Sequence, residues 1–207
     1  MTQDMIREQI LDYLENTYKP RAVLFYGSYV RGDADEYSDF DCMVLVDAKT
    51  VKHDDAVIGG VRLDCFVFTV QEAGSEDPDI FLTAYDAEIV KDDGAGQALR
   101  ERVRRYVEEH RTYDEEEKQF IESWIRKTLE RMRKGDDEGH FRAVALLWES
   151  LTDYCLLRDR FYFGSKDTIR YLKDRAPEGY RLFHPAVTEK TPESIEAWGR
   201  YVIRPEK

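Results

Sequence analysis

Short apolar runs separated by polar turns dominate the first half of the chain. They predict buried strands at residues 22–26, 39–46, 61–69 and 87–90, which follow one amphipathic helix at residues 4–17. In that helix the apolar side chains recur at helical spacing, and a proline follows its end. The pattern indicates a half built from strands and helices.

From residue 94 onward, helical periodicity replaces these short runs. Five helices are predicted there, at residues 97–110, 114–134, 140–159, 166–174 and 193–201. Gly135, Gly164 and Pro177 are expected to interrupt them. The sequence therefore predicts an α+β fold, in which a small mixed β-sheet with flanking helices precedes an all-α helical bundle. We place the two domains at residues 1–110 and 111–207.

The composition and net charge of the chain limit the kinds of molecule that it is expected to bind. Hydrophobic residues make up 42% of the 207-residue chain, which is enough for packed cores. A net charge of −12 repels long polyanions, so DNA and RNA are poor candidates for the acceptor and we expect no long nucleic acid as a partner. We expect no membrane association, because no apolar stretch reaches spanning length and the N-terminus lacks the features of a signal peptide. Cys42, Cys65 and Cys155 have no metal-binding spacing, which favours reduced, buried thiols in a cytoplasmic protein.

A polar segment after the first strand carries the first candidate chemistry. Gly27 and Ser28 follow the buried run directly, where a glycine allows a sharp turn and close approach of another group. The backbone N–H groups exposed after such a turn suit phosphate oxygens. Arg31 lies close enough to offset phosphate charge with its planar guanidinium.

Three aspartates carry the second candidate chemistry. Asp39 and Asp41 are two residues apart on a predicted strand, so their side chains point to the same face. Asp64 stands between apolar residues of the next long strand and is costly there unless it is paired or binds a metal ion. If the two strands are neighbours, the three carboxylates converge and favour a hard divalent cation such as Mg²⁺.

The run GSYVRGDADEYSDFD resembles the signature of the DNA polymerase β-like nucleotidyltransferase superfamily. The similarity is strongest to small bacterial members, which include the kanamycin and lincosamide nucleotidyltransferases. The resemblance implies that Gly27 and Ser28 bind a triphosphate, that Asp39 and Asp41 bind metal, and that Asp64 is the third acidic residue of a nucleotidyltransferase fold.

The resemblance also implies a reaction. We expect transfer of a nucleoside monophosphate from an NTP co-substrate, with two Mg²⁺ ions, to a hydroxyl of a small-molecule acceptor. An aminoglycoside- or lincosamide-like antibiotic is one candidate acceptor. Arg31 and Ser38 are assigned to the nucleotide site. In the antibiotic-modifying relatives a carboxylate of the helical domain is the base, and we assign this role to Glu149, with Asp153 one helical turn away left open.

Several alternatives remain at this stage. The same chemistry serves antitoxins that adenylylate a partner protein, although a fused helical half favours a self-contained acceptor site. A nucleotide-binding module without catalysis is a third hypothesis, against which the three aspartates argue. Asp153 has a purely structural alternative, a pair with Arg158 or Lys166. The preferred base of the NTP and the oligomeric state are left open, a homodimer being one outcome.

Overall fold

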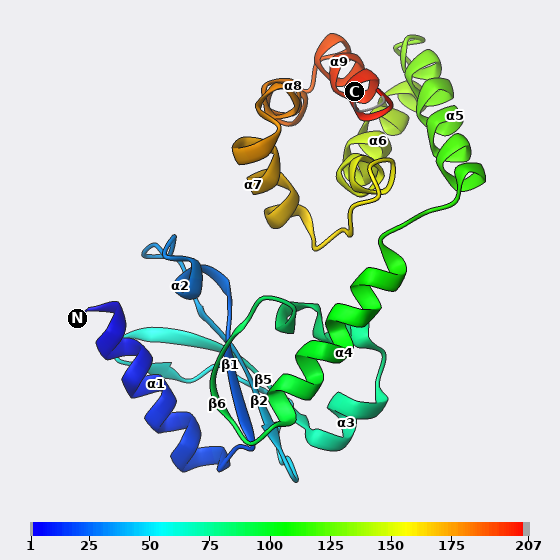
Figure 1. Cartoon of the computed structure of the whole chain (residues 1–207). Helices are drawn as coiled ribbons and strands as arrows, with labels where there is room; N and C mark the ends of the chain where they lie inside the picture. Colours follow the sequence, from blue (N-terminus) through cyan, green and yellow to red (C-terminus); the bar gives the residue numbers. More distant parts are fainter. Residues whose placement is uncertain (1, 205–207) are drawn as a thin grey trace. The chain divides into compact units, whose positions relative to one another are not determined.

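The computed structural model describes residues 2–204 of the chain. It divides into two compact units, Met1–Tyr106 and Val107–Lys207, which are described separately below (Figure 1). The first contains a β-sheet with helices and the second only helices. This architecture agrees with the α+β fold class predicted from the sequence.

The first unit opens with a helix and then builds its sheet from short strands. Its elements are α1 (Gln3–Tyr18), β1 (Ala22–Phe25), α2 (Gly27–Arg31), β2 (Phe40–Val46), β3 (His53–Asp54), β4 (Val57–Ile58), β5 (Val61–Thr69), α3 (Val70–Ser75), the 3₁₀ helix η1 (Pro78–Ala84), β6 (Glu88–Asp92) and the larger part of α4 (Ala95–His110), whose last four residues belong to the second unit. The strand order is β3-β5-β2-β1-β6, with β4 paired to β5 beside this path. The β2–β5 pair is parallel and the other pairs are antiparallel, so the sheet is mixed.

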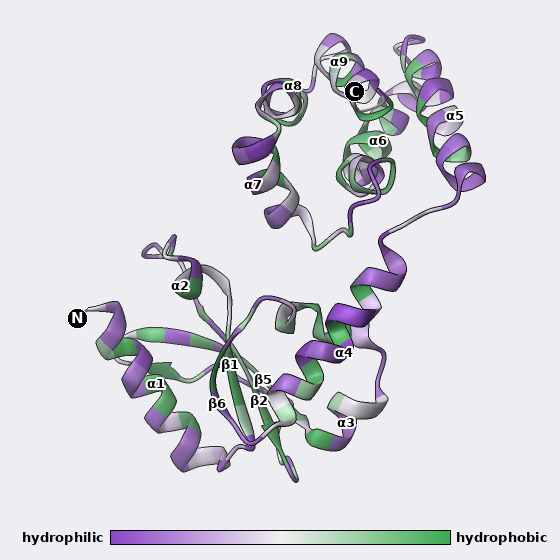
Figure 2. Cartoon of the chain, in the orientation of Figure 1, coloured by the Kyte–Doolittle hydropathy of each residue, from purple (hydrophilic) through white to green (hydrophobic). Residues whose placement is uncertain are grey.

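The two faces of this sheet are covered differently. Ile10 and Leu14 of α1 pack with Cys42 and Val44 of β2 in one hydrophobic core, and Val67 of β5 joins them. Because side chains alternate along a strand, the residues between these point to the opposite face. Figure 1 shows α1 on one side of the sheet and α3 and α4 on the other. Figure 2 shows hydrophobic residues concentrated on the central strands, as burial on both faces requires.

The second unit is a helical bundle with its own core. Its helices are α5 (Glu115–Met132), α6 (Asp137–Leu156), α7 (Ser165–Arg175), α8 (Pro177–Thr188) and α9 (Pro192–Val202). The rings of Tyr154, Phe183 and Trp198 meet in this core, with centroid distances of 5.9 Å for Tyr154–Trp198 and 5.2 Å for Phe183–Trp198. The stacking joins α6, α8 and α9 into one hydrophobic centre.

Several local features differ from the sequence prediction, among them α3 and η1, which it did not include. Residues 27–31 form the helix α2, although residues 29–38 were expected to be loop. The connector before β5 contains the two-residue strands β3 and β4, which are too short to show periodicity. Pro177 begins α8 rather than only interrupting a helix, because proline lacks the N–H that a first-turn residue would leave unbonded.

Burial of the thiols agrees with expectation. Cys42 and Cys65 are fully buried in the sheet unit, Cys155 is 3% exposed in the helical unit, and all three are free. None of the helices formed by residues 2–204 is long and apolar enough to cross a membrane.

Candidate active site

Asp41 and Asp64 lie side by side on neighbouring strands. The parallel β2–β5 pair runs in register, so that Asp41 is the Cα partner of Asp64. Neighbouring strands are about 4.8 Å apart, and in-register residues of a parallel pair point to the same face. Both residues are half-buried, next to the fully buried Cys42 and Cys65. The sheet therefore brings together two of the three predicted carboxylates.

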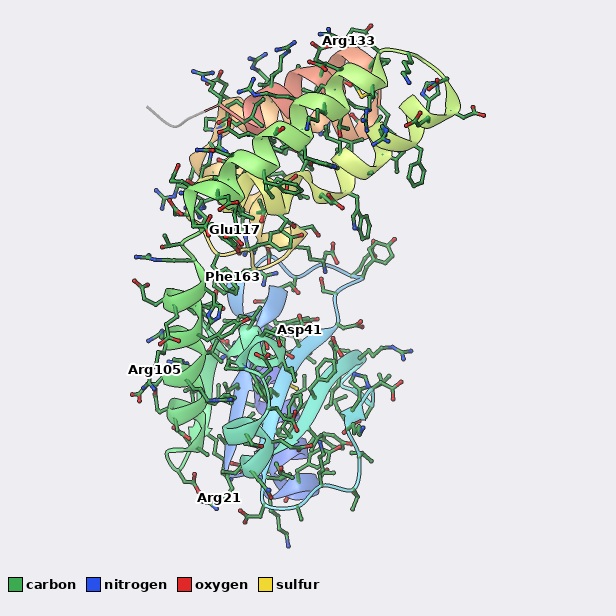
Figure 3. All side chains as sticks on the ribbon, turned by 90° about the vertical axis from the view of Figure 1, so that its right-hand side faces the viewer. Arg21, Asp41, Arg105, Glu117, Arg133 and Phe163 are labelled. Carbon is green, nitrogen blue, oxygen red and sulfur yellow. The ribbon has the colours of Figure 1, made fainter. Side chains whose placement is uncertain are left out.

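Gly27 lies directly against Asp41. It follows the end of β1 with a φ of +74°, a conformation that favours glycine. A Cβ atom at this position would be 1.7 Å from Asp41 Oδ2, far inside van der Waals contact. The backbone N–H of Tyr26 also donates to the Asp41 carbonyl oxygen at 3.1 Å. The turn after β1 is thus in direct contact with the start of β2, where Figure 3 labels Asp41.

The short helix α2 follows this turn. The Ser28 carbonyl accepts hydrogen bonds from the N–H groups of Gly32 at 2.9 Å and Asp33 at 3.1 Å. Gly32 has a φ of +82° and ends the helix. Arg31 Nε lies 3.3 Å from Asp33 Oδ1, and this pair engages one edge of the guanidinium. Ser28 and Arg31 therefore lie on the short helix that directly follows the turn in contact with Asp41.

Ser38 and Asp39 complete the segment before β2. Ser38 Oγ donates to Asp35 Oδ1 and accepts from Asp35 N, both at 2.9 Å, so its hydroxyl closes a local turn. The hydrogen bond from Ser38, followed by that from the Tyr37 N–H, lowers the pKa of Asp35 below its ordinary value. Asp39 comes one residue before β2 and is exposed. Its two-residue spacing from Asp41 suits a shared face.

Asp64 has a partner that the sequence did not reveal. His53 Nε2 lies 2.7 Å from Asp64 Oδ1, and the two side chains are 42% and 39% exposed. His53 is located on β3, within the segment predicted to be a polar connector. The Gly59-Gly60 pair directly before β5 is the signal in the sequence that is typical of a hairpin turn there.

The pKa of Tyr26 is affected by the charges of Asp41 and Asp64. Its hydroxyl donates to the Cys42 carbonyl at 3.2 Å. Burial raises the pKa of Tyr26, and the neighbouring Cys42, Asp64 and Asp41 raise it further. Negative charge therefore accumulates at this end of the sheet.

The donor set at this end consists of oxygen atoms, which are the ligands that hard divalent cations prefer. Asp41 and Asp64 in register, together with Asp39 two residues before Asp41, offer the carboxylate oxygens that such an ion binds. Within residues 2–204, however, no group of three or more His, Cys, Asp or Glu side chains is arranged as a metal site. Asp41 and Asp64 are thus the pair that the fold itself brings together.

The two candidate bases of the helical unit, Glu149 and Asp153, lie one turn apart on α6. Glu149 is exposed, whereas Asp153 is 5% exposed and its Oδ2 has no hydrogen-bond partner. Burial, and then the charge of Glu149, raises the pKa of Asp153 to about 7. The suggested pair between Asp153 and Arg158 is not formed. Arg158 instead donates to backbone carbonyls, including that of Val202 at 2.9 Å.

Comparisons with known proteins identify a family and a solved structure to which this chain is similar. A family model described as a nucleotidyltransferase domain matches residues 7–142. Among solved structures, the chain is similar to a nucleotidyltransferase-like protein from Exiguobacterium sibiricum 255-15. The TM-score is 0.39 and the sequence identity 11%, over 97% of this chain and 74% of that one. No curated protein matches the chain.

Proposed function

The chain belongs to the nucleotidyltransferase domain family, and from this premise we propose that it transfers a nucleoside monophosphate from a Mg²⁺-bound NTP to a hydroxyl of a small-molecule acceptor. The observation that carries the proposal is the in-register pair of Asp41 and Asp64 beside the Gly27 turn. Family membership supports transfer in general, and the acceptor class is our proposal.

The reaction is an in-line displacement at the α-phosphorus. A bond forms between the acceptor oxygen and phosphorus, and the bond to the departing pyrophosphate breaks. Asp39, Asp41 and Asp64 would hold two Mg²⁺ ions, which supply charge neutralisation and acidify the attacking hydroxyl when bound. The Gly27 turn and Ser28 would bind the β- and γ-phosphates, with Arg31 offsetting their charge and Ser38 lining the nucleotide site.

We assign the catalytic domain to residues 1–110 and the acceptor-binding domain to residues 111–207. A helical unit with its own aromatic core supports a self-contained acceptor domain. An aminoglycoside- or lincosamide-like compound remains our first acceptor to test. A helical partner protein that co-purifies and becomes adenylylated would instead favour the antitoxin type.

Glu149 is our proposed acceptor of the hydroxyl proton. It is exposed and so accessible to an acceptor molecule, whereas Asp153 is buried. Positioned general bases contribute about 10²–10⁴-fold, so we expect Glu149→Gln to lower turnover by at least about 100-fold. Undiminished turnover would remove Glu149 from the mechanism and leave Asp153 as the candidate.

The test of the whole proposal is direct. The purified protein is incubated with Mg²⁺, each of the four NTPs labelled at the α-phosphate, and a panel of hydroxylated acceptors. We expect label transfer and pyrophosphate release that depend on both acceptor and Mg²⁺. Tight NTP binding without pyrophosphate release under any condition would favour a module that has lost catalysis.

A further inference from the structure

His53 contacts Asp64, one of the three carboxylates to which the proposed reaction assigns the metal ions. We propose that His53 is a positioning residue, which holds Asp64 Oδ1 through a hydrogen bond and leaves Oδ2 for a divalent cation. The inference rests on the proposed function. Its basis is the 2.7 Å separation of His53 Nε2 and Asp64 Oδ1. Because an ionised carboxylate can only accept, the imidazole donates through Nε2–H.

The register of the sheet explains why His53 reaches Asp64. On β3, His53 is the Cα partner of Phe66 and Asp54 is the partner of Cys65. Cys65 belongs to the core under α1, so alternation directs Asp54 toward α1 and His53 toward the face of Asp64. The imidazole also packs edge-on against the Phe66 ring, with centroids 5.1 Å apart.

Three hydrogen bonds to Asp54 anchor the strand that carries His53. Asp54 Oδ2 accepts from the hydroxyls of Tyr13 at 3.0 Å and Tyr18 at 2.5 Å, both on α1. Asp54 Oδ1 accepts from the Ala56 N–H at 2.9 Å. Burial acts to raise the pKa of Asp54, but these hydrogen bonds outweigh it and lower the pKa below its ordinary value. The two tyrosine hydrogen bonds thereby attach β3, a two-residue edge strand, to α1.

Fixing Asp64 in advance has a specific benefit. A carboxylate on a half-exposed strand rotates broadly about its last torsion, and binding a cation would have to halt this rotation. The hydrogen bond from His53 restricts Asp64 before the cation arrives. Partners of this kind, which orient a ligand without touching the metal, commonly change metal affinity by about 10–100-fold. An ion pair this exposed contributes little to stability, so folding and positioning can be measured separately.

The test measures Mn²⁺ binding by electron paramagnetic resonance, independently of activity. We expect His53→Ala to raise the Mn²⁺ dissociation constant by about tenfold or more. It should lower kcat with little change in the KM for NTP. His53→Gln retains a donor and should recover most of the affinity. His140→Ala, at an exposed histidine of the helical unit, is the matched control and should behave as wild type.

A double-mutant cycle makes the result decisive. In an Asp64→Ala background, His53→Ala should have no further effect on the remaining Mn²⁺ affinity, because the carboxylate that His53 positions is already absent. Wild-type affinity and kcat in His53→Ala, or an undiminished effect in that background, would overturn the inference. Failure of the proposed function looks different, since the wild type itself would then show no metal-dependent transfer.

Discussion

A methyl group on the α-carbon of Gly27 would come within 1.7 Å of Asp41 Oδ2. The Gly27 turn and the Asp41 carboxylate are therefore in close contact, although the turn follows β1 and Asp41 is on β2. A side chain at position 27 would displace the Asp41 carboxylate, and this contact ties the proposed nucleotide site to the proposed metal site.

The first prediction concerns this contact. Gly27→Ala should displace Asp41 and lower kcat by about 100-fold, because misplacement by about 1 Å has that effect in active sites. It also carries the backbone strain of a positive φ, about 1–2 kcal/mol. Steady-state pyrophosphate release measures the loss. Gly60→Ala is the control for strain, because Gly60 has a φ of +88° but nothing within 4 Å of an added Cβ. Equal loss in both variants would contradict the argument.

The second prediction concerns Mg²⁺ and stability. A cation that binds only the folded state stabilises it, by about 2.7 kcal/mol at a hundredfold excess over the dissociation constant. We expect Mg²⁺ to raise the melting temperature of the wild type, and EDTA to reverse the rise. Asp41→Asn and Asp64→Asn should each abolish most of this shift. The idea fails if either variant keeps the full Mg²⁺-dependent rise.

The third prediction concerns Asp153. Burial raises its pKa to about 7 in the folded protein, against 3.8 as its ordinary value. The folded state therefore keeps a proton that the unfolded state releases, so stability falls as pH rises between these values and is constant above about 7. Asp153→Asn removes this dependence. Relative to the wild type, the free energy of unfolding of the Asp153→Asn variant should rise by up to about 1.4 kcal/mol per pH unit between pH 3.8 and about pH 7.

Urea denaturation between pH 4.5 and pH 8 measures this difference. Asp174→Asn, at an exposed aspartate of the same unit, should follow the wild-type profile throughout. Parallel profiles for Asp153→Asn and wild type would show that Asp153 is ionised normally.

The fourth prediction concerns acid stability. Glu72 accepts from Thr69 in the capping box of α3 and pairs with Lys49 Nζ at 2.6 Å. The hydrogen bond from Lys49 is the largest cause that lowers the pKa of Glu72, from 4.5 to about 2. The stabilisation is thus complete above pH 4.5 and is lost as pH falls toward 2.

Glu72→Gln should cost about 1–2 kcal/mol at neutral pH, after allowance for solvent screening, and progressively less in acid. Thermal unfolding at pH 7 and pH 3 provides the comparison. A cost that is the same at both values would mean that the charge of Glu72 contributes nothing.

The sequence predicted the carboxylates of the sheet for a definite reason. Alternation along residues 61–69 separates Asp64 from its buried neighbours, and the same rule predicts one face for Asp39 and Asp41, although Asp39 lies one residue before β2. Alternation needs several residues to be visible, so the two-residue strand that carries His53 escaped it. His53 reaches Asp64 because β3 pairs with β5, and its own two-residue strand carries no pattern that predicts this pairing.

The helical half shows a different limit. Glu149 and Asp153 are one turn apart on one helix face, and the sequence places Glu149 first with Asp153 left open because the similarity to relatives is too weak there to choose. The structure separates them by burial, because one faces solvent and the other is enclosed by the packed bundle. Burial is decided by contacts between helices distant in sequence, and a helical period reports none of them.

The enclosed thiols give each unit an internal reporter. Cys42 and Cys65 have no solvent exposure in the sheet unit, and Cys155 has 3% in the helical unit. Thiolates react with alkylating agents and enclosed thiols do not, so each cysteine is modified only when its surroundings open. Pulsed alkylation followed by mass spectrometry would therefore time the opening of the two units separately, in the unaltered protein.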